Sequence, residues 1–324
     1  MRMIALEEHW GTSVVERALQ TVGITTPLGL PAIVSQKLKD LGAGRLADMD
    51  AVGIDVQVLS LAGTTGIDKL PPADATAVAC ECNDIIASAV AGHPNRFAAF
   101  AFLAMQDPES AAAELERCVT SLGFKGVMIN GTTNGLFLDD PRFYPVLAQA
   151  EKLNVPIYLH PAPPPSTVYE AYFSGLPGNV GNRLSIAGWG WHVENGLHSL
   201  RLVLAGVFDR FPALQVIIGH MGENIPFSLA RSDSILTPVA SHLERPVKDY
   251  FMSNFHITTS GYFTLPPLLC ALMVFGADRM LFAVDYPFSS NTVGKAFLDN
   301  APLTPADLEK IAHANAERLL KITN

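Results

Sequence analysis

The sequence predicts a single α/β domain, a TIM-like (β/α)8 barrel with an insertion after its fifth strand. Eight apolar runs of strand type alternate with segments of helical type, and no linker or low-complexity stretch divides the 324 residues. Eight parallel strands close a barrel, and about 250 residues plus insertions is its usual length. An open doubly wound sheet is the alternative, but no Gly-x-Gly-x-x-Gly follows an early run. We therefore expect one domain over residues 1–324.

The strands are expected where short apolar runs are bounded by turn-forming residues. The predicted strands cover residues 4–9, 54–61, 97–102, 126–129, 155–159, 214–219, 256–259 and 280–283. Helices are expected between them, with Pro108 and Pro305 at first helical positions and Gly53 as a C-cap. The predicted helices cover residues 33–49, 74–92, 108–121, 141–153, 194–208, 225–233 with a polar extension to 249, 266–275 and a last helix from 305.

Two segments interrupt this alternation. Residues 11–31 form a polar stretch with glycines and prolines, and residues 161–191 are rich in proline, glycine and aromatic residues. The second begins with four prolines, at positions 161, 163, 164 and 165. Because both segments follow predicted strands, we expect them to cover the mouth of the barrel.

The composition excludes several classes of partner. Nearly half of the residues (49%) are hydrophobic and 16% are charged, which allows a sizeable core. The net charge of −9 argues against nucleic acid or an anionic membrane surface as a partner. Four cysteines show neither zinc-ribbon nor redox spacing, and no stretch approaches about 18 uninterrupted apolar residues. With no pattern of a signal peptide, we expect a cytoplasmic protein with reduced thiols.

Residues that commonly bind metals stand where predicted strands end. Glu7 and His9 close the first strand, and the alternation of side chains puts both on one face and Glu8 on the other. Later strands end in similar residues: Asn130, His160, His220 and Asp285. The first stretch alone is also compatible with a charged edge strand. In a barrel, however, all strands open at the same end, so these side chains are expected to converge.

Five short motifs carry a resemblance to a known family. They are residues 5–9 (ALEEH), 159–161 (LHP), 218–223 (IGHMGE), 255–261 (FHITTSG) and 281–288 (LFAVDYPF). With them the chain resembles, over almost its whole length, the amidohydrolase superfamily. The similar branch comprises metal-dependent aromatic-acid decarboxylases, such as the γ-resorcylate, 2,3-dihydroxybenzoate, 5-carboxyvanillate and aminocarboxymuconate semialdehyde decarboxylases. The wider superfamily usually opens with His-x-His, whereas Glu7 stands at the first of those positions here.

The resemblance implies one divalent metal ion held by Glu7, His9, His160 and Asp285. A carboxylate in place of one imidazole makes the site richer in oxygen, which favours Mn²⁺ and leaves Mg²⁺ and Zn²⁺ open. It also implies a small aromatic carboxylic acid as the substrate. A homodimer or homotetramer is expected as well.

Further residues are candidates for catalysis or for substrate binding. His220 and Glu223 are three residues apart, so we interpret them as an acid/base pair, although Glu223 could simply favour a helix start. Arg231 could hold a substrate carboxylate or tie its helix to the barrel. Asn130 could hydrogen-bond the substrate or only form a turn. Trp10 could line an aromatic pocket or pack in the core.

Three classes of function remain open at this stage. The first is a nonoxidative decarboxylase, in which Asp285 protonates the carboxyl-bearing ring carbon before CO2 leaves, assisted by His220 and Glu223. The second is a hydrolase or hydratase that uses the metal to activate water. The third is a binding protein on the same scaffold, which predicts a broken ligand set. The complete set in this sequence argues against the third class, and the resemblance favours the first over the second, which shares its ligands.

Overall fold

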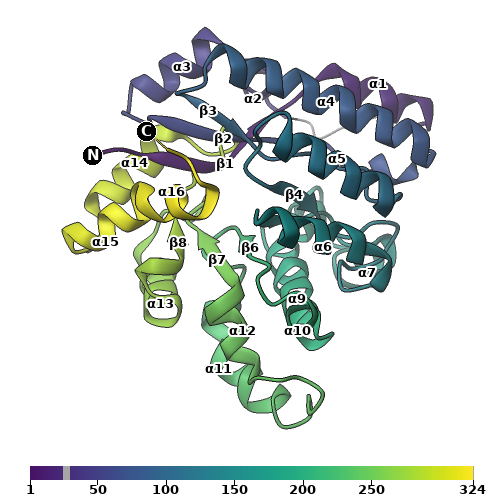
Figure 1. Ribbon diagram of the computed structural model, residues 1–324, viewed down its shortest axis with the longest axis vertical. Helices are drawn as coiled ribbons and strands as arrows, with labels where there is room; N and C mark the ends of the chain where they lie inside the picture. The colour runs from purple at the N-terminus through teal and green to yellow at the C-terminus, as the bar shows by residue number, and fades with distance from the viewer. Residues whose placement is uncertain (25–29, 324) are drawn as a thin grey trace.

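The computed structural model describes residues 1–24 and 30–323, in which a ring of parallel strands is surrounded by helices (Figure 1). Residues 25–29, part of the first segment expected to cover the mouth, lie outside this description. The strands are β1 (Ile4–Trp10), β2 (Val56–Leu61), β3 (Phe97–Ala99), β4 (Val127–Asn130), β5 (Ile157–His160), β6 (Val216–Ile218), β7 (Phe255–Thr258) and β8 (Met280–Leu281).

Neighbouring strands pair in chain order, in one sheet from β1 to β3 and another from β4 to β8. A bridge between Ala101 and Val127 joins the end of β3 to β4. At the other seam Leu6 of β1 bridges to Ala283, just beyond β8, and the Leu6 amide donates to the Phe282 carbonyl at 3.0 Å. These links complete the predicted (β/α)8 barrel.

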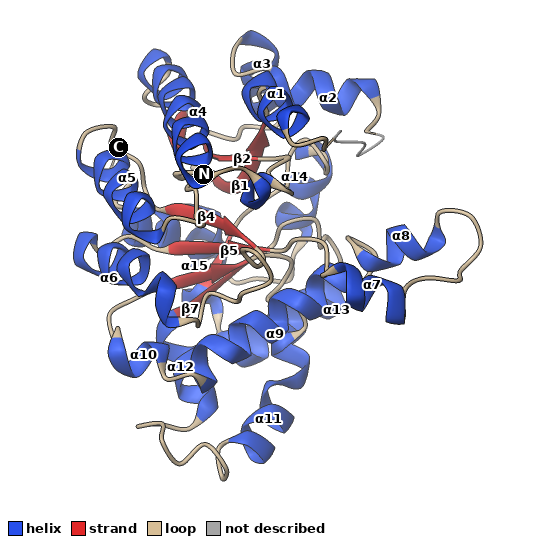
Figure 2. Cartoon of the chain, turned by 90° about the vertical axis from the view of Figure 1, so that its right-hand side faces the viewer, coloured by secondary structure: helices blue, strands red, loops and turns tan. Residues whose placement is uncertain are grey.

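The helices cover the outside of the ring. They are α1 (Ser13–Thr21), α2 (Ala32–Lys39), α3 (Ala43–Asp50), α4 (Pro72–Gly92), α5 (Pro108–Thr120), α6 (Tyr144–Leu153), α7 (Ser166–Tyr172), α8 (Val180–Ser185), α9 (Gly190–Leu204), α10 (Val207–Arg210), α11 (Ile225–Leu236), α12 (Val247–Asn254), α13 (Leu265–Phe275), α14 (Asn291–Asn300), α15 (Pro305–Glu309) and α16 (Asn315–Leu320). The strand arrows point toward the side on which α7 and α8 project (Figure 2).

Side chains fill the inside of the barrel. Alternate strand positions supply this inner cluster, which includes Ile4, Leu6, Val56, Val58, Ala98, Phe100, Met128, Tyr158, Ile217, Leu281 and Ala283. The residues between them face outward into a second, larger core between strands and helices, as the period of two in a strand requires. The inner cluster supports the site from below.

Two predicted helices are interrupted in the structure. The helix expected over residues 33–49 is two helices, α2 and α3, separated at Asp40, whose Oδ1 accepts the Gly42 amide at 2.8 Å. This local bond competes with helix continuation, as is typical of an aspartate side chain that accepts the amide two residues on. The helix expected over residues 194–208 begins earlier and divides into α9 and α10 at Gly206, which has φ 73°.

Other helices lie where none was expected. The polar stretch 11–31 contains α1, which begins at Thr12, where the hydroxyl accepts the Val14 amide at 3.2 Å. Short helices α7 and α8 occupy the proline-rich insertion, and α14 was not predicted, whereas α12 begins within the extension predicted for residues 234–249. Because α7 and α8 have only seven and six residues, tertiary packing rather than periodicity defines them.

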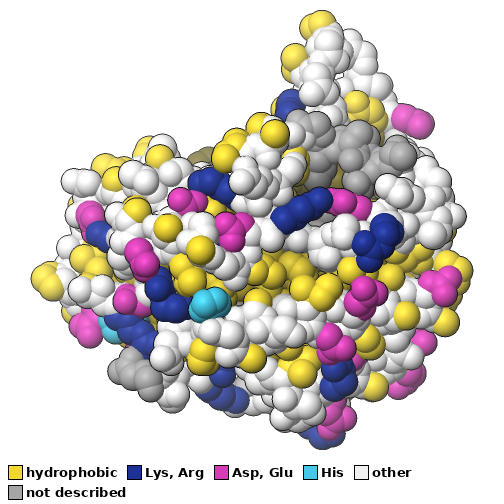
Figure 3. Space-filling view, turned by 90° about the horizontal axis from the view of Figure 1, so that it is seen from above, with side chains coloured by type: hydrophobic (Ala, Val, Ile, Leu, Met, Phe, Trp, Pro, Cys, Tyr) yellow, Lys and Arg dark blue, Asp and Glu magenta, His cyan; other side chains and the backbone are white. Residues whose placement is uncertain are grey.

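The surface agrees with the expectations from composition. Lys and Arg side chains are interspersed with Asp and Glu on the face seen from above, so no area of one sign gathers there (Figure 3). None of the helices described is long and apolar enough to cross a membrane. All four cysteines are free. The cytoplasmic location stays a prediction.

Two buried histidines make stability depend on pH. His198 Nε2 accepts the Leu138 amide at 2.7 Å, and His256 Nε2 accepts from the Arg279 guanidinium at 3.1 Å, so both rings are neutral. Burial lowers the pKa of each to about 3. Below pH 6.5 the unfolded chain binds protons that the folded chain does not. We expect the free energy of unfolding to fall by about 1.4 kcal/mol per pH unit per histidine as the pH drops from 6.5 toward 3.

Urea unfolding at pH 6.5, 5.5 and 4.5 measures this dependence. His198→Gln keeps a hydrogen-bond acceptor but cannot titrate, so its stability should fall less steeply than that of the wild type. The exposed His242 supplies the control, as His242→Gln should follow the wild-type slope. If the free energy of unfolding falls equally steeply with pH in the wild type and in His198→Gln, the lowered pKa of His198 would be contradicted.

Candidate active site

The first strand contains a bulge that sets the position of Glu7. Between Ala5 and Glu8 the register of β1 advances by three residues while β2 advances by two, and Glu7 takes a left-handed φ of 58°. A regular strand with Ile4 and Leu6 inside would also place Glu8 inside. The extra residue turns Glu7 inward instead, directly above Leu6, as bulges beside active sites commonly do.

Beyond the bulge, Glu7 and His9 point inward and Glu8 points outward, as the sequence predicts. His9 Nδ1 lies 3.2 Å from the hydroxyl of Ser60. Glu8 accepts the Val284 amide at 2.8 Å and the Gln57 side chain at 3.1 Å, and burial raises its pKa well above the usual range. Glu8 therefore ties β1 to its neighbours and takes no part in the site.

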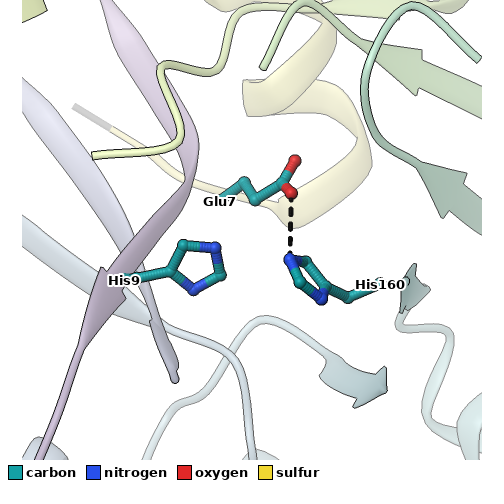
Figure 4. Close-up of side chains that lie close together, drawn as sticks. All are labelled: Glu7, His9 and His160. Atoms are coloured by element: carbon teal, nitrogen blue, oxygen red, sulfur yellow. Dashed lines mark ion pairs between the residues drawn. The ribbon is translucent and has the colours of Figure 1, made fainter. Parts of the chain in front are cut away.

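Three side chains from two strands form a group able to bind a metal ion (Figure 4). Atoms of Glu7, His9 and His160 lie within 4.8 Å of one another, and Glu7 Oε1 is 3.3 Å from His160 Nε2. The two imidazole rings meet edge to face, with their centroids 5.0 Å apart. Two ligand atoms each about 2.1 Å from one ion and at right angles lie about 3.0 Å apart, so this spacing suits one small cation.

The chemistry of these donors also fits a divalent cation. Glu7 has no exposed surface, and its Oε1 has no hydrogen-bond partner. His160 donates its Nδ1 proton to the Pro161 carbonyl at 2.7 Å, which leaves the lone pair of Nε2 facing Glu7. Burial alone would raise the pKa of Glu7, but His220, His160 and His9 outweigh it and hold that pKa below its usual range. Glu7 is thus an ionised carboxylate with one free oxygen.

Asp285 lies at the edge of this group, in the loop after β8. Its Oδ1 is 3.2 Å from His9 Nε2, and its backbone has φ 68°. Asp285 is not part of the group of Glu7, His9 and His160, whose atoms all lie within 4.8 Å of one another. It contacts that group through His9. The partly exposed side chain is accessible from the barrel mouth.

A second buried cluster adjoins the first and is centred on Glu223. Its Oε1 accepts from His220 Nδ1 at 2.7 Å and from Asn195 at 3.2 Å, while its Oε2 accepts from His192 Nδ1 at 2.6 Å. Despite complete burial, the two histidines hold the pKa of Glu223 down to about 2. The carboxylate therefore fixes the Nδ1 proton of both rings.

The other nitrogen of His220 faces the first cluster. Its Nε2 lies 3.6 Å from Glu7 Oε1, and Asp285 is close enough to act on its charge. Burial would lower the pKa of His220, but Glu223 and Glu7 outweigh it and raise that pKa to about 10. With Nδ1 committed to Glu223, proton exchange at His220 takes place at Nε2.

Four of these residues share an unusual backbone conformation. Glu7, His220, Glu223 and Asp285 all have φ between 52° and 68°. Non-glycine residues in this region cost of order 1–3 kcal/mol each and cluster at functional sites. The strain marks the same residues that the side-chain geometry brings together.

The remaining predicted residues, Asn130, Arg231 and Trp10, lie in three different surroundings. Asn130 pairs in register with His160 and lines a cavity of about 500 Å³, a size suited to a small ligand. Arg231 is exposed on α11, and the structure does not bring it to the buried clusters. Trp10 is 1% exposed and packs in the outer core, so the alternative of core packing is correct for Trp10.

Several residues of the site were not predicted. Tyr158 donates to Glu7 Oε2 and precedes His160 by two positions, so strand alternation could have found it. His192, which the sequence did not single out, donates its Nδ1 proton to Glu223. The spacing of His192 and Asn195 on one face of α9 is the only local signal for this pair. Nothing in the sequence marks Ser60.

Aromatic side chains flank the metal-binding group. The Phe288 ring lies 5.5 Å from that of His9, and the Trp191 ring 6.4 Å from that of His160. Phe288 also lines a smaller cavity of about 150 Å³, to which α1 and α2 contribute other side chains. The site therefore offers apolar ring surfaces beside a cluster of ionic ligands.

Comparison with known proteins places this site in a family. The sequence pattern of the amidohydrolase family matches residues 34–322. The decarboxylase orsB of Emericella nidulans is 40% identical, over 99% of this chain and 97% of its own length.

Solved structures that are similar over 99% of this chain include two decarboxylases. One is the dihydroxybenzoic acid decarboxylase of Polaromonas sp. JS666 with bound manganese and the inhibitor 2-nitroresorcinol, with 36% identity, 97% of that chain covered and a TM-score of 0.87. The other is the 5-carboxyvanillate decarboxylase of Sphingomonas paucimobilis, with 34% identity, 99% of that chain covered and a TM-score of 0.91. This chain belongs to the amidohydrolase family.

Proposed function

We propose that this protein is a metal-dependent, nonoxidative decarboxylase of a hydroxylated aromatic acid. The observation that carries the proposal is the juxtaposition of two buried clusters at one barrel mouth. One is the metal-binding group of Glu7, His9 and His160, and the other is the proton-exchanging pair of His220 and Glu223. Relatives similar over the full chain are decarboxylases of aromatic acids, which supports the same class of substrate.

Glu7, His9, His160 and Asp285 would hold the ion. One carboxylate oxygen from each acid and one nitrogen from each imidazole suit Mn²⁺ first, and also Zn²⁺ or Mg²⁺. When bound, a divalent cation supplies positive charge that attracts the substrate carboxylate and stabilises negative charge on the neighbouring hydroxyl oxygen. Manganese in the Polaromonas relative supports this choice.

The protein's own groups would place the substrate and supply the proton. Phe288 and Trp191 offer ring surfaces, and Asn130, which pairs in register with His160, is available for a hydrogen bond. Asp285 would donate its proton to the ring carbon that carries the carboxylate, forming a C–H bond. The C–C bond then breaks, its electron pair returns to the ring, and CO2 leaves. This order avoids an aryl carbanion, which is far too basic to form.

His220 would assist at Nε2, the nitrogen that Glu223 leaves free. Because Glu223 holds Nδ1, the ring cannot change its tautomer, and one atom both receives and releases the proton. The same atom lies near Asp285 and Glu7, where it would return a proton to Asp285 after each turnover.

Supplying a panel of ortho-hydroxybenzoates and following CO2 release tests the function directly. In heavy water the product should carry deuterium at the vacated ring carbon. A hydrolase or hydratase is the competing function. If these acids are inert with every divalent metal while an ester or lactone is hydrolysed, the decarboxylase proposal is wrong.

The metal-binding group predicts one divalent ion per chain. His160→Ala removes a nitrogen that lies 3.3 Å from Glu7 Oε1, so bound metal and activity should both be lost. His93→Ala changes a histidine at the end of α4 and should retain one ion per chain. Elemental analysis measures both, and two ions per chain, or full occupancy in His160→Ala, would refute the ligand set.

The proton donor is tested by Asp285→Asn, which keeps the shape of the side chain but carries no transferable acid proton. Turnover should fall by about 10²–10⁴-fold, the usual range for loss of a general acid. Asp278→Asn is the matched control, because Asp278 is exposed and pairs with Lys310 at 2.9 Å. Steady-state rates decide, and an active Asp285→Asn enzyme would exclude this role.

We also propose a homodimer or homotetramer. Large apolar side chains remain exposed on helices, among them Phe227 on α11 at 90% and Met273 on α13 at 87%. Contact with a second copy would remove these surfaces from water. Light scattering at micromolar concentration should give a multiple of the 34.8 kDa chain, and a monomer mass would dismiss the proposal.

A further inference from the structure

The second oxygen of Glu7 has a dedicated partner. The hydroxyl of Tyr158 donates to Glu7 Oε2, and both side chains are fully buried. Tyr158 lies in β5 two residues before His160, so both point into the barrel from the same strand. One strand thus contacts both oxygens of the carboxylate, with Tyr158 at Oε2 and His160 at Oε1.

A line of hydroxyl groups continues from Tyr158. Its oxygen lies 2.9 Å from Thr258 Oγ1, which lies 2.8 Å from Ser260 Oγ, and Ser260 accepts the His220 amide at 2.9 Å. Glu7 can only accept and an amide N–H can only donate. Each hydroxyl has one proton, so every proton in the line points toward Glu7.

The common direction of these protons strengthens the hydrogen bond from Tyr158 to Glu7. A hydroxyl that itself accepts a hydrogen bond becomes a better donor, so Thr258 strengthens the bond from Tyr158 to Glu7. The acceptor is ionised, and a buried bond to a charged group is among the stronger ones. Rotation of the carboxylate would break it.

A missing side chain leaves space for this arrangement. Gly219 follows β6 at an inward position, and a Cβ there would lie 2.8 Å from Glu7 Oε2 and 3.2 Å from the Tyr158 hydroxyl. Both distances are shorter than normal contacts. A side chain at residue 219 would therefore push the Glu7 carboxylate away from its present position beside Tyr158.

We propose that Tyr158 and Gly219 are positioning residues that hold Glu7 so that Oε1 alone is offered to the metal ion. Oε2 is committed to Tyr158, and Oε1 has no hydrogen-bond partner and faces His160 and His220. The inference rests on the proposed metal site. It adds that Glu7 contributes one oxygen rather than two, which leaves a coordination position for the substrate.

The experiment is a titration of metal-free protein with Mn²⁺, in which free Mn²⁺ is followed by electron paramagnetic resonance. Tyr158→Phe removes only the hydroxyl and should weaken Mn²⁺ binding by about 10–100-fold, the usual effect of losing a partner of a metal ligand. Thr258→Val removes the donor to Tyr158 and should weaken binding less. Gly219→Ala should weaken binding by displacing the carboxylate.

Tyr250→Phe is the matched control. Tyr250 is also fully buried, and its hydroxyl also donates to a carboxylate, that of Asp209, outside the site. A loss of stability alone should appear in Tyr250→Phe, as a lower thermal midpoint with unchanged Mn²⁺ affinity. Thermal midpoints of all variants without metal identify any that do not fold.

The outcomes separate this inference from the proposed function. Folded Tyr158→Phe with an Mn²⁺ affinity within twofold of the wild type would overturn the positioning role. If Tyr158→Phe does not fold, Gly219→Ala is judged by the same criterion. A wild-type protein that binds no Mn²⁺ would remove the metal site itself, and with it this inference. Failure to decarboxylate any acid leaves the affinity measurement unaffected.

Discussion

A carboxylate without any exposed surface lies inside the barrel at Glu7, and the rest of the site depends on keeping it ionised. Removing an isolated charge from water costs several kcal/mol, so such a group persists only with partners. Tyr158 supplies a hydrogen bond, while His160 and His220 supply imidazole nitrogens close to the other oxygen. The bulge in β1 turns Glu7 toward these partners, and the absence of a side chain at Gly219 leaves space for its carboxylate.

The barrel and the positions of the main ligands could be predicted from the sequence because both follow from periodicity. Apolar runs define the strands, and in a parallel barrel all strand ends meet at one mouth. That rule places Glu7, His9 and His160 together at the mouth, whereas their interpretation as ligands of one metal ion comes from the family resemblance. Asp285 and His220 also lie at this mouth, since they follow the last residues of β8 and β6.

What the sequence did not reveal arises from contacts between distant segments. The bulge before Glu8 cannot be recognised in the sequence, because the extra residue does not interrupt the run of residues typical of a strand. His192 lies on a helix after an irregular insertion, so its contact with Glu223 depends on the docking of α9. Trp10 shows the reverse error, since an aromatic residue beside a ligand suggested a pocket wall but faces the outer core.

The side chains that fill the barrel also determine from which side a substrate reaches the site and products leave it. Ile4, Leu6 and Tyr158 belong to a layer of side chains that closes the barrel axis beneath the ligands. The site is therefore closed along the barrel axis, and molecules reach it from the mouth, on the side where α7 and α8 project (Figure 2). A substrate, a gaseous product and an aromatic product must share this opening.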